Sequence, residues 1–354
     1  WCIGVEGEVI SRGKDANKKL ATGEIEVEAK ELRVFNRAET TPFAIHDKCD
    51  ADEKIRLKYR YLDLRRPCLN YNIITRSKVT GIIRRVLESK DFLDLETPIL
   101  GKSTPEGARD YLVPSRVQPG AFYALPQSPQ LFKQLYMVSG FDRYYQIARC
   151  FRDEDLRLDR QPEFTQIDIE MSFIEPEDIQ SICEEMICTI FKEILDIDLP
   201  RPFKRITWDD AMNLYGVDAP DIRFGMLLND VTEIFRNTEF KLFAQALEQK
   251  QGTIRAICVP ASVKMSRKDI EQGLSDAEKT ALIEQMKPED GATLLFVADK
   301  LNIARNALGR VRKEIAVKNN WVPKTMSKPE DVGLTWVTDF PMFEWSDEDN
   351  RWYA

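Results

Sequence analysis

Residues 163–170 alternate between two kinds of side chain at every second position, and this constrains the fold more than any other segment. Period-two alternation is typical of a strand that presents different groups on its two faces. The faces would be Phe164, Gln166, Asp168 and Glu170 on one side and Thr165, Ile167 and Ile169 on the other. The run from Phe151 to Glu170 also contains a charged stretch, so two strands joined by a charged loop are predicted. One face of this sheet should build a polar pocket.

Arg152 is predicted to lie on the first of these strands. A fixed guanidinium can hold a phosphate with two hydrogen bonds, and it stabilises most where negative charge grows in a transition state. Phe164 could stack on a nucleobase. A solvated hairpin laced with salt bridges is the alternative that charge density alone favours. The order Phe-Arg-x-Glu, basic loop, Phe-x-Gln-x-Asp argues against that alternative.

Two neighbouring segments offer groups for a small charged ligand. Residues 102–111 contain a proline and lie in a polar, glycine-containing run, which predicts a mobile loop whose Glu106 could meet an ammonium group. In residues 124–135 a strand is predicted to end at Pro126 and Ser128 to cap a helix. Gln130 and Lys133 are three residues apart and would share one helix face, which suits a carboxylate. Taken alone, the first segment is better interpreted as an ordinary turn and the second as a capped helix with a surface lysine.

The rest of the chain predicts a mixed α+β fold. Extended segments are expected at 3–9, 25–34, 92–98, 253–260, 292–298 and 334–343, and helices at 68–90, 179–194, 227–235, 275–286 and 301–317. Ser275 and Glu278 have the spacing of a capping box. Phe340, Met342 and Phe343 are interpreted as core residues.

Composition excludes several classes of function. Of the 354 residues, 43% are hydrophobic and 31% charged, and no apolar run reaches the ~18–20 residues of a membrane span. The seven cysteines are scattered and never spaced as C-x-x-C, which favours a reducing cytoplasm. His46 is the only histidine, so no Ser-His or multi-histidine metal mechanism can be assembled. The net charge of −8 leaves RNA contact to local basic clusters at 56–60 and 65–66.

Taken together, these segments resemble the bacterial-type aspartyl-tRNA synthetases, a class II synthetase family. The resemblance covers most of the chain and includes residues 21–26 and 57–67. Residues 92–98 are similar to class II motif 1, and residues 151–173 are similar to motif 2. It implies an antiparallel class II sheet flanked by helices, with a partial N-terminal OB-type β-barrel and an α/β insertion domain. The implied parts are a partial barrel (1–36), a connector (37–66), a first catalytic part (67–220), the insertion (221–328) and the start of a second catalytic part (329–354).

The resemblance also assigns roles to single residues. Glu106 and Ser128 would hold the amino end of aspartate, with Gln130 and Asp168 beside them, and Lys133 would pair with its side-chain carboxylate. Arg152 would act catalytically by bridging aspartate and the ATP α-phosphate. The ATP contacts would be Arg152, Asp153, Glu154, Gln161, Phe164 and Gln166. Arg157 and Arg160 would approach the tRNA acceptor end, and Pro98 would lie at a dimer interface.

The implied reaction activates L-aspartate with ATP and passes the aspartyl group to tRNA-Asp, with tRNA-Asn left open as a second acceptor. The implied partners are these substrates and a second copy in a homodimer, with neither membrane nor DNA. A synthetase for asparagine or lysine and a non-catalytic RNA-binding paralogue are the alternatives. Lys133 disfavours lysine, because like charges would meet.

The chain departs from the family pattern at both ends. It begins inside the barrel and ends at Ala354, before the family's histidine-bearing loop, motif 3 and the acidic ligands expected for Mg²⁺. No metal ligand is therefore expected within this chain. The insertion is also shorter than expected, notably between Lys268 and Ser275.

Overall fold

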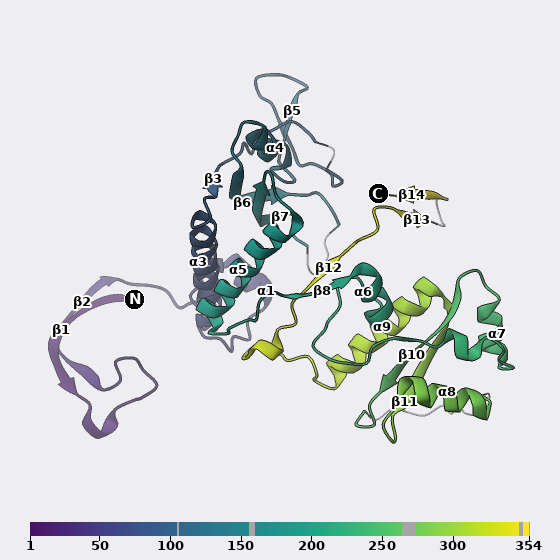
Figure 1. The fold of residues 1–354 in the computed structure, drawn as a ribbon. Coiled ribbons are helices and arrows are strands. Elements are labelled where there is room, and N and C mark those ends of the chain that lie inside the picture. Colours follow the sequence, from purple (N-terminus) through teal and green to yellow (C-terminus); the bar gives the residue numbers. More distant parts are fainter. Residues whose placement is uncertain (105, 156–159, 264–273, 347–349, 354) are drawn as a thin grey trace. The chain divides into compact units, whose positions relative to one another are not determined.

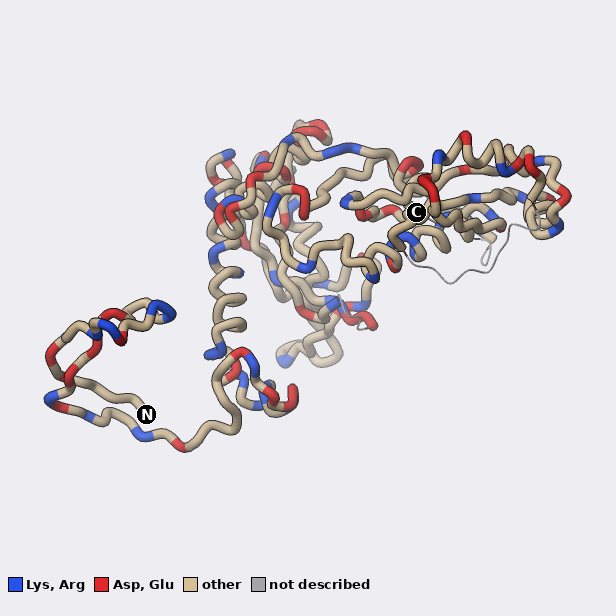
Figure 2. The backbone as a smooth tube through the Cα atoms, turned by 90° about the horizontal axis from the view of Figure 1, so that it is seen from below, with Lys and Arg blue, Asp and Glu red and all other residues tan. Residues whose placement is uncertain are grey.

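A computed structural model describes residues 1–104, 106–155, 160–263, 274–346 and 350–353. The chain divides into two compact units, Trp1–Lys78 and Val79–Ala354 (Figure 1). Basic and acidic residues are interspersed along the described backbone of both units (Figure 2). Among the described residues, no helix is both long and apolar enough to cross a membrane.

The first unit opens with an antiparallel strand pair, β1 (Cys2–Ser11) and β2 (Ile25–Asn36), separated by the 3-10 turn η1 (Gly13–Asp15). Both strands match the predicted extended segments. Their apolar side chains stay exposed, as in Val27 at 51% and Leu32 at 60%. Two strands alone do not bury a core, so this pair is compatible with the predicted partial barrel, which remains a prediction.

The connector of the first unit is organised around a buried carboxylate. The short helices α1 (Glu53–Lys58) and α2 (Arg60–Asp63) lead into the long helix α3 (Pro67–Glu88). Asp63 is fully buried and accepts from Arg60 at 2.7 Å and from Arg66 at 2.9 Å, with Arg56 at 3.9 Å. Arg66 also donates to the carbonyl oxygens of residues 46 and 47. Three cations of the basic cluster are thus drawn to one carboxylate.

The second unit contains the sheet that carries the polar face. Its strands are β3 (Leu93–Asp94), β6 (Arg143–Phe151) and β7 (Glu163–Met171), in the order β3-β6-β7. The strands β6 and β7 pair antiparallel, whereas β3 joins β6 in parallel. A separate hairpin is formed by β4 (Leu112–Pro114) and β5 (Phe122–Ala124), and α4 (Gln130–Val138) follows it. The predicted strand–loop–strand segment is confirmed.

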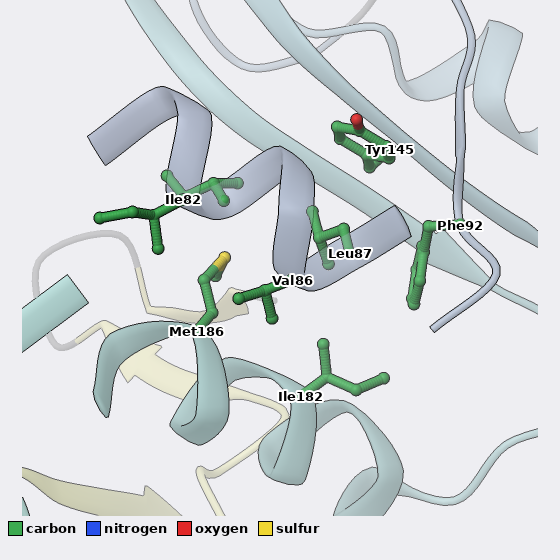
Figure 3. Packing of buried hydrophobic residues seen from close by; sticks show 8 residues of the cluster. Ile82, Val86, Leu87, Phe92, Tyr145, Ile182 and Met186 are labelled. Atoms are coloured by element: carbon green, nitrogen blue, oxygen red, sulfur yellow. The ribbon is translucent and has the colours of Figure 1, made fainter. Parts of the chain in front are cut away.

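Two helices cover the apolar face of this sheet. The second half of α3 and the helix α5 (Pro176–Leu195) pack together with Phe92 and with Tyr145 of β6 (Figure 3). Ile147, Ile169 and Met171 lie against the same cluster. The start of α5 is stabilised by a capping box between Glu175 and Asp178 and by Pro176 in its first turn. With the apolar face covered, the opposite face of β6 and β7 is left for polar side chains.

A second group of elements builds the segment predicted as an insertion. It comprises β9 (Asn229–Asp230), η2 (Thr232–Phe235), α7 (Lys241–Leu247), β10 (Gly252–Val259), α8 (Asp276–Met286), β11 (Thr293–Lys300) and α9 (Leu301–Lys318). Its antiparallel sheet has the order β11-β10-β9. The predicted Ser275–Glu278 capping box is confirmed. The region expected to be shortened, 268–275, lies mostly outside the described residues.

One helix prediction in this segment is wrong. Residues 227–235 form the short strand β9 and a 3-10 turn, because 229 and 230 pair with the edge of β10. Pairing with a buried strand outweighs the helical spacing of the apolar residues. The bounds predicted for the insertion as a domain stay a prediction.

After the segment predicted as an insertion, the chain forms a strand that pairs with the strand preceding that segment. The strand β8 (Lys204–Thr207) precedes α6 (Trp208–Tyr215), and β12 (Thr335–Thr338) pairs with β8 in parallel after η4 (Pro329–Asp331). The hairpin of β13 (Glu344–Ser346) and β14 (Arg351–Tyr353) follows. The predicted strand 334–343 is thus shorter than expected. Phe340, Met342 and Phe343 are 53% or more exposed, so their assignment to the core is wrong. The α+β class is confirmed.

Candidate functional site

The predicted alternation along β7 is realised in three dimensions. Asp168 pairs with Gln146 of β6, and Gln166 pairs with Ala148. These residues lie on the face opposite Ile169 and Ile147, which pack into the core. Phe164 and Glu170 belong to the same polar face as Asp168. This face receives side chains from α4, which contacts both strands.

At the centre of this face lies a buried ion pair. Lys133 of α4 donates through Nζ to Oδ1 of Asp168 at 2.9 Å, and Oε2 of Glu170 lies 3.2 Å from the same nitrogen. The side chains of Lys133 and Asp168 are each 9% exposed. Oδ2 of Asp168 is buried and accepts no hydrogen bond of good geometry among the described residues, although the Tyr144 hydroxyl acts on the same carboxylate. A buried acceptor without a well-placed donor is costly, so this oxygen is ready to receive a cationic ligand group.

The predicted loop meets the start of α4 through Glu106. Its Oε2 accepts a hydrogen bond from Ser128 at 2.8 Å, and Thr104 donates to its Oε1 at 3.1 Å. Ser128 is not the N-cap of the helix as predicted, since Pro129 occupies that position. Ser128 Oγ still accepts from the N–H of Gln130 at 3.3 Å. Its hydroxyl therefore serves the loop and the helix start together.

A second pocket-forming group surrounds Arg152. This residue follows β6 directly, not within the strand as predicted, and its N–H donates to the carbonyl of Pro162 at 2.9 Å. Its guanidinium lies over the ring of Phe164, 5.1 Å from the centroid. Arg160 forms an ion pair with Glu154 at 2.6 Å. A pocket of about 290 Å³ is lined by Arg152, Glu154, Asp155, Arg160, Gln161, Pro162 and Phe164.

Cys150 connects the two groups. Its thiol is fully buried and donates to Oε1 of Gln166 at 3.3 Å. Burial raises the pKa of Cys150 to about 11, and the charges of Asp168, Arg152, Glu106 and Lys133 all act on that pKa. The residues around Lys133 nevertheless do not line the 290 Å³ pocket.

Burial also holds Tyr144 of β6 in its neutral form. Desolvation first and the charge of Asp168 second raise the pKa of its phenol, and the hydroxyl donates to Gln146 at 2.9 Å. A phenol that stays protonated can act only as a hydrogen-bond partner beside the carboxylate.

Sequence reasoning missed Gln127, which is only 1% exposed. Its amide binds the backbone of Ala108 and the carboxylate of Asp110. Hydrogen bonds from Ser103 and then Gln127 lower the pKa of Asp110. In the sequence, Gln127 is only a polar residue between Pro126 and the predicted helix start. This position does not reveal that its partners are Ala108 and Asp110.

Pro98 does not line the pocket around Arg152. It is exposed and lines a separate pocket of about 530 Å³ together with Arg84, Asp94, Thr97 and residues of β6. Thr97 donates to Gln146 at 2.9 Å, which connects this segment to the polar face of β6. Arg157, predicted to approach a nucleic acid, falls outside the described residues.

The fit of a divalent metal can be tested on the donor set. Over the described ranges, no three His, Cys, Asp or Glu side chains are grouped so that they could hold a metal ion. Divalent cations such as Mg²⁺ need several oxygen ligands around one point. The described residues therefore do not make a metal site.

The fold is that of class II aminoacyl-tRNA synthetases. The chain resembles asparaginyl-tRNA synthetase from Pyrococcus horikoshii, solved with asparaginyl-adenylate, at a TM-score of 0.50 and 23% identity over 59% of this chain and 50% of that one. The Entamoeba histolytica asparaginyl-tRNA synthetase also gives a TM-score of 0.50, at 19% identity over 59% of this chain and 50% of that one. Residues 52–351 match the family of class II tRNA synthetases for D, K and N, and the chain belongs to this family.

Curated relatives align over the whole length of this chain. It is 48% identical to the aspartate–tRNA(Asp/Asn) ligase of Caldanaerobacter subterraneus and 49% identical to the aspartate–tRNA ligase of Geobacillus kaustophilus. In both cases the chain spans 64% of the relative's length. The first alignment extends over 384 positions, so some positions of that relative have no counterpart among these 354 residues.

Proposed function

We propose that this chain carries the amino-acid and ATP sites of an aspartate–tRNA ligase. The observation that carries the proposal is the buried Lys133–Asp168 pair, in which one oxygen of Asp168 accepts no hydrogen bond of good geometry from the described residues. A zwitterionic ligand with a second carboxylate complements this pair at both ends. Its ammonium would reach Oδ2 of Asp168, and its side-chain carboxylate would reach Lys133. The aspartate–tRNA ligases found among the relatives support this choice of ligand.

The remaining aspartate contacts follow from the loop and the helix start. Glu106 and Ser128 would hold the amino end, and Gln130 would lie beside them. Selectivity against asparagine would rest on Lys133 plus other cationic groups, because an uncharged amide would leave buried positive charge unpaired at the ligand. The loop carboxylate at Glu106 is already held by Ser128, so little ordering is needed when the substrate enters.

ATP would occupy the pocket around Arg152. The ring of Phe164 would stack on adenine, with Glu154 and Gln161 at the same end and Asp153 and Gln166 along the nucleotide. Arg152 would bridge the aspartate carboxylate and the α-phosphate. Its present position over Phe164 keeps the guanidinium beside the ring that would hold adenine.

The proposed reaction is attack of the aspartate α-carboxylate on the α-phosphorus of ATP. The new bond joins a carboxylate oxygen to phosphorus, and the bond to the bridging oxygen of pyrophosphate breaks. The aspartyl group then passes from the adenylate to a hydroxyl of the 3′-terminal ribose of tRNA-Asp. Positioning and charge neutralisation by Arg152 and Lys133 supply the acceleration. Arg157 and Arg160 would approach the tRNA end, and tRNA-Asn remains a second candidate acceptor.

Mg²⁺ would accompany ATP as the counter-ion of its phosphates, as the family implies. No step is assigned to the metal. A homodimer is proposed through the surface at Pro98, where Ile99 and Leu100 are at least half exposed. A cytoplasmic location is proposed because all seven cysteines are free thiols.

The test is amino-acid-dependent exchange of pyrophosphate into ATP with full-length protein. We expect exchange with aspartate and its loss in Arg152→Ala, while Arg143→Ala at the start of β6 retains it. Exchange that depends on asparagine or lysine would overturn the substrate assignment. Exchange unaffected by Arg152→Ala would overturn the role of the arginine, and no exchange with any amino acid would favour the non-catalytic paralogue.

A further inference from the structure

The side chain of Gln127 is a buried connector between two loops. Its Oε1 accepts from the N–H of Ala108 at 3.1 Å, and its Nε2 donates to the carbonyl of Ala108 at 2.9 Å. The same Nε2 donates to Oδ1 of Asp110 at 2.5 Å. One amide thus holds both backbone groups of Ala108 and the carboxylate two residues on. A buried amide with all these bonds made is costly to replace, because each lost bond leaves a buried polar group unpaired.

The strip 108–110 that Gln127 holds touches both halves of the proposed site. On one side, Ser103 donates to the second carboxylate oxygen of Asp110 at 2.5 Å, which ties down the arm that leads to Glu106. On the other side, the carbonyl of Arg109 accepts from the N–H of Asp153 at 3.0 Å. Asp153 is the neighbour of Arg152. A shift of the strip 108–110 would therefore move the segment that carries Glu106 and the segment that carries Arg152 together.

We propose that Gln127 is a positioning residue that couples the aspartate loop to the ATP-binding arm through the strip 108–110. This proposal rests on the proposed function, because it takes Glu106 and Arg152 as the two substrate-binding ends. Gln127 contacts neither substrate. It acts by fixing the backbone from which both arms extend, so binding of either substrate depends on the same three hydrogen bonds.

The test uses Gln127→Glu in full-length protein. A carboxylate cannot donate to Ala108 or Asp110 and places a second negative charge beside Asp110. We expect KM for aspartate and KM for ATP in pyrophosphate exchange to rise together, each by about tenfold. The matched control is Gln118→Glu on an exposed turn, which should leave both KM values unchanged.

A second variant separates coupling from general damage. In Gln127→Glu combined with Asp110→Asn, the asparagine can donate to the new carboxylate and still accept from Ser103. This double variant restores the bond between residues 127 and 110 but not the bond to the Ala108 carbonyl, so it should recover part of the rise in both KM values, whereas Asp110→Asn alone should raise both. A change in only one KM, or a double variant that is folded but not rescued, would overturn the coupling.

A readout without catalysis keeps this test distinct from failure of the proposed function. Hydrogen–deuterium exchange at the backbone N–H of Asp153 should speed up in Gln127→Glu and return toward the wild-type rate in the double variant. Unchanged protection of that amide would overturn the proposal even if the wild-type enzyme is active. If the wild type shows no aspartate-dependent exchange, the proposed function fails, while the amide result still decides the coupling.

Discussion

Lys133 and Asp168 form an ion pair at 2.9 Å in which both side chains are 9% exposed. Removing one partner of a buried pair leaves an uncompensated charge. In Lys133→Met we expect a loss of ~3–5 kcal/mol in the free energy of unfolding, measured by urea denaturation. Lys192→Met is the matched control, because Lys192 pairs with two exposed carboxylates. Equal losses in the two variants would contradict the structural role of the buried pair.

The carboxylate of Glu184 holds together segments that are far apart in sequence. It accepts from the N–H of Phe203 at 3.0 Å and from the indole N–H of Trp336 at 2.9 Å, and it is 4% exposed. Glu184→Leu should cost about 1–3 kcal/mol for each donor left unpaired. Glu184→Gln keeps an acceptor oxygen and should cost less. The comparison is made by denaturant unfolding, and equal costs for the two variants would show that lost hydrogen bonding is not the cause.

Because Asp63 is buried among arginines, we expect the stability of the first unit to decrease at acidic pH. Burial acts to raise the pKa of Asp63, but Arg66, Arg56 and Arg60 outweigh it, so this pKa lies below its ordinary value of 3.8. A lowered carboxyl pKa contributes stability that is present above pH ~4 and is lost as the pH falls through the folded-state pKa. The free energy of unfolding of the wild type should therefore exceed that of Asp63→Asn above about pH 4, and this difference should shrink as the pH falls below about 4.

This comparison is made by following urea unfolding with circular dichroism from pH 6 to pH 3. Asp50→Asn, at an exposed position without a recorded contact among the described residues, serves as the control. An advantage over Asp63→Asn that stays constant down to pH 3 would contradict the prediction.

The thiol of Cys150 should resist alkylation in the folded protein. Its pKa is raised to about 11 by burial, and only the thiolate reacts. At pH 8, iodoacetamide should label the exposed Cys2 within minutes and leave Cys150 unmodified until denaturant is added. Mass spectrometry of peptides reads both sites in one sample. Labelling of Cys150 at the rate of Cys2 would mean that the polar face opens readily.

The site could be predicted where local periodicity determines which way a side chain points. The alternation along β7 correctly put Asp168 and Gln166 on one face, because a strand has only two faces. Gln127 escaped prediction because its partners lie 17 and 19 residues away and depend on how the loop closes. Ser128 differs from its prediction by one position only: its Oγ accepts from the N–H of Gln130, but the helix begins one residue later than expected, with Pro129 as its N-cap residue.

The fold was predictable where elements are long and amphipathic. Helices α3, α5 and α9 lie close to their expected ranges. The segment 227–235 failed because a two-residue pairing with β10 outweighs helical spacing, and a short apolar run is ambiguous between helix and strand. The residues after β12 failed because hydrophobic type alone does not determine burial, as the 78% exposure of Met342 shows.

The parallel pairing of β8 with β12 has a consequence for how this chain can change over time. Parallel neighbours cannot be joined by a tight turn and need a crossover of a dozen residues or more. The segment between Thr207 and Thr335 is that crossover, and closure entropy rises only slowly with its length. Residues can therefore be gained or lost within the detour while the paired strands keep their register, so this stretch is where length should vary most freely among relatives.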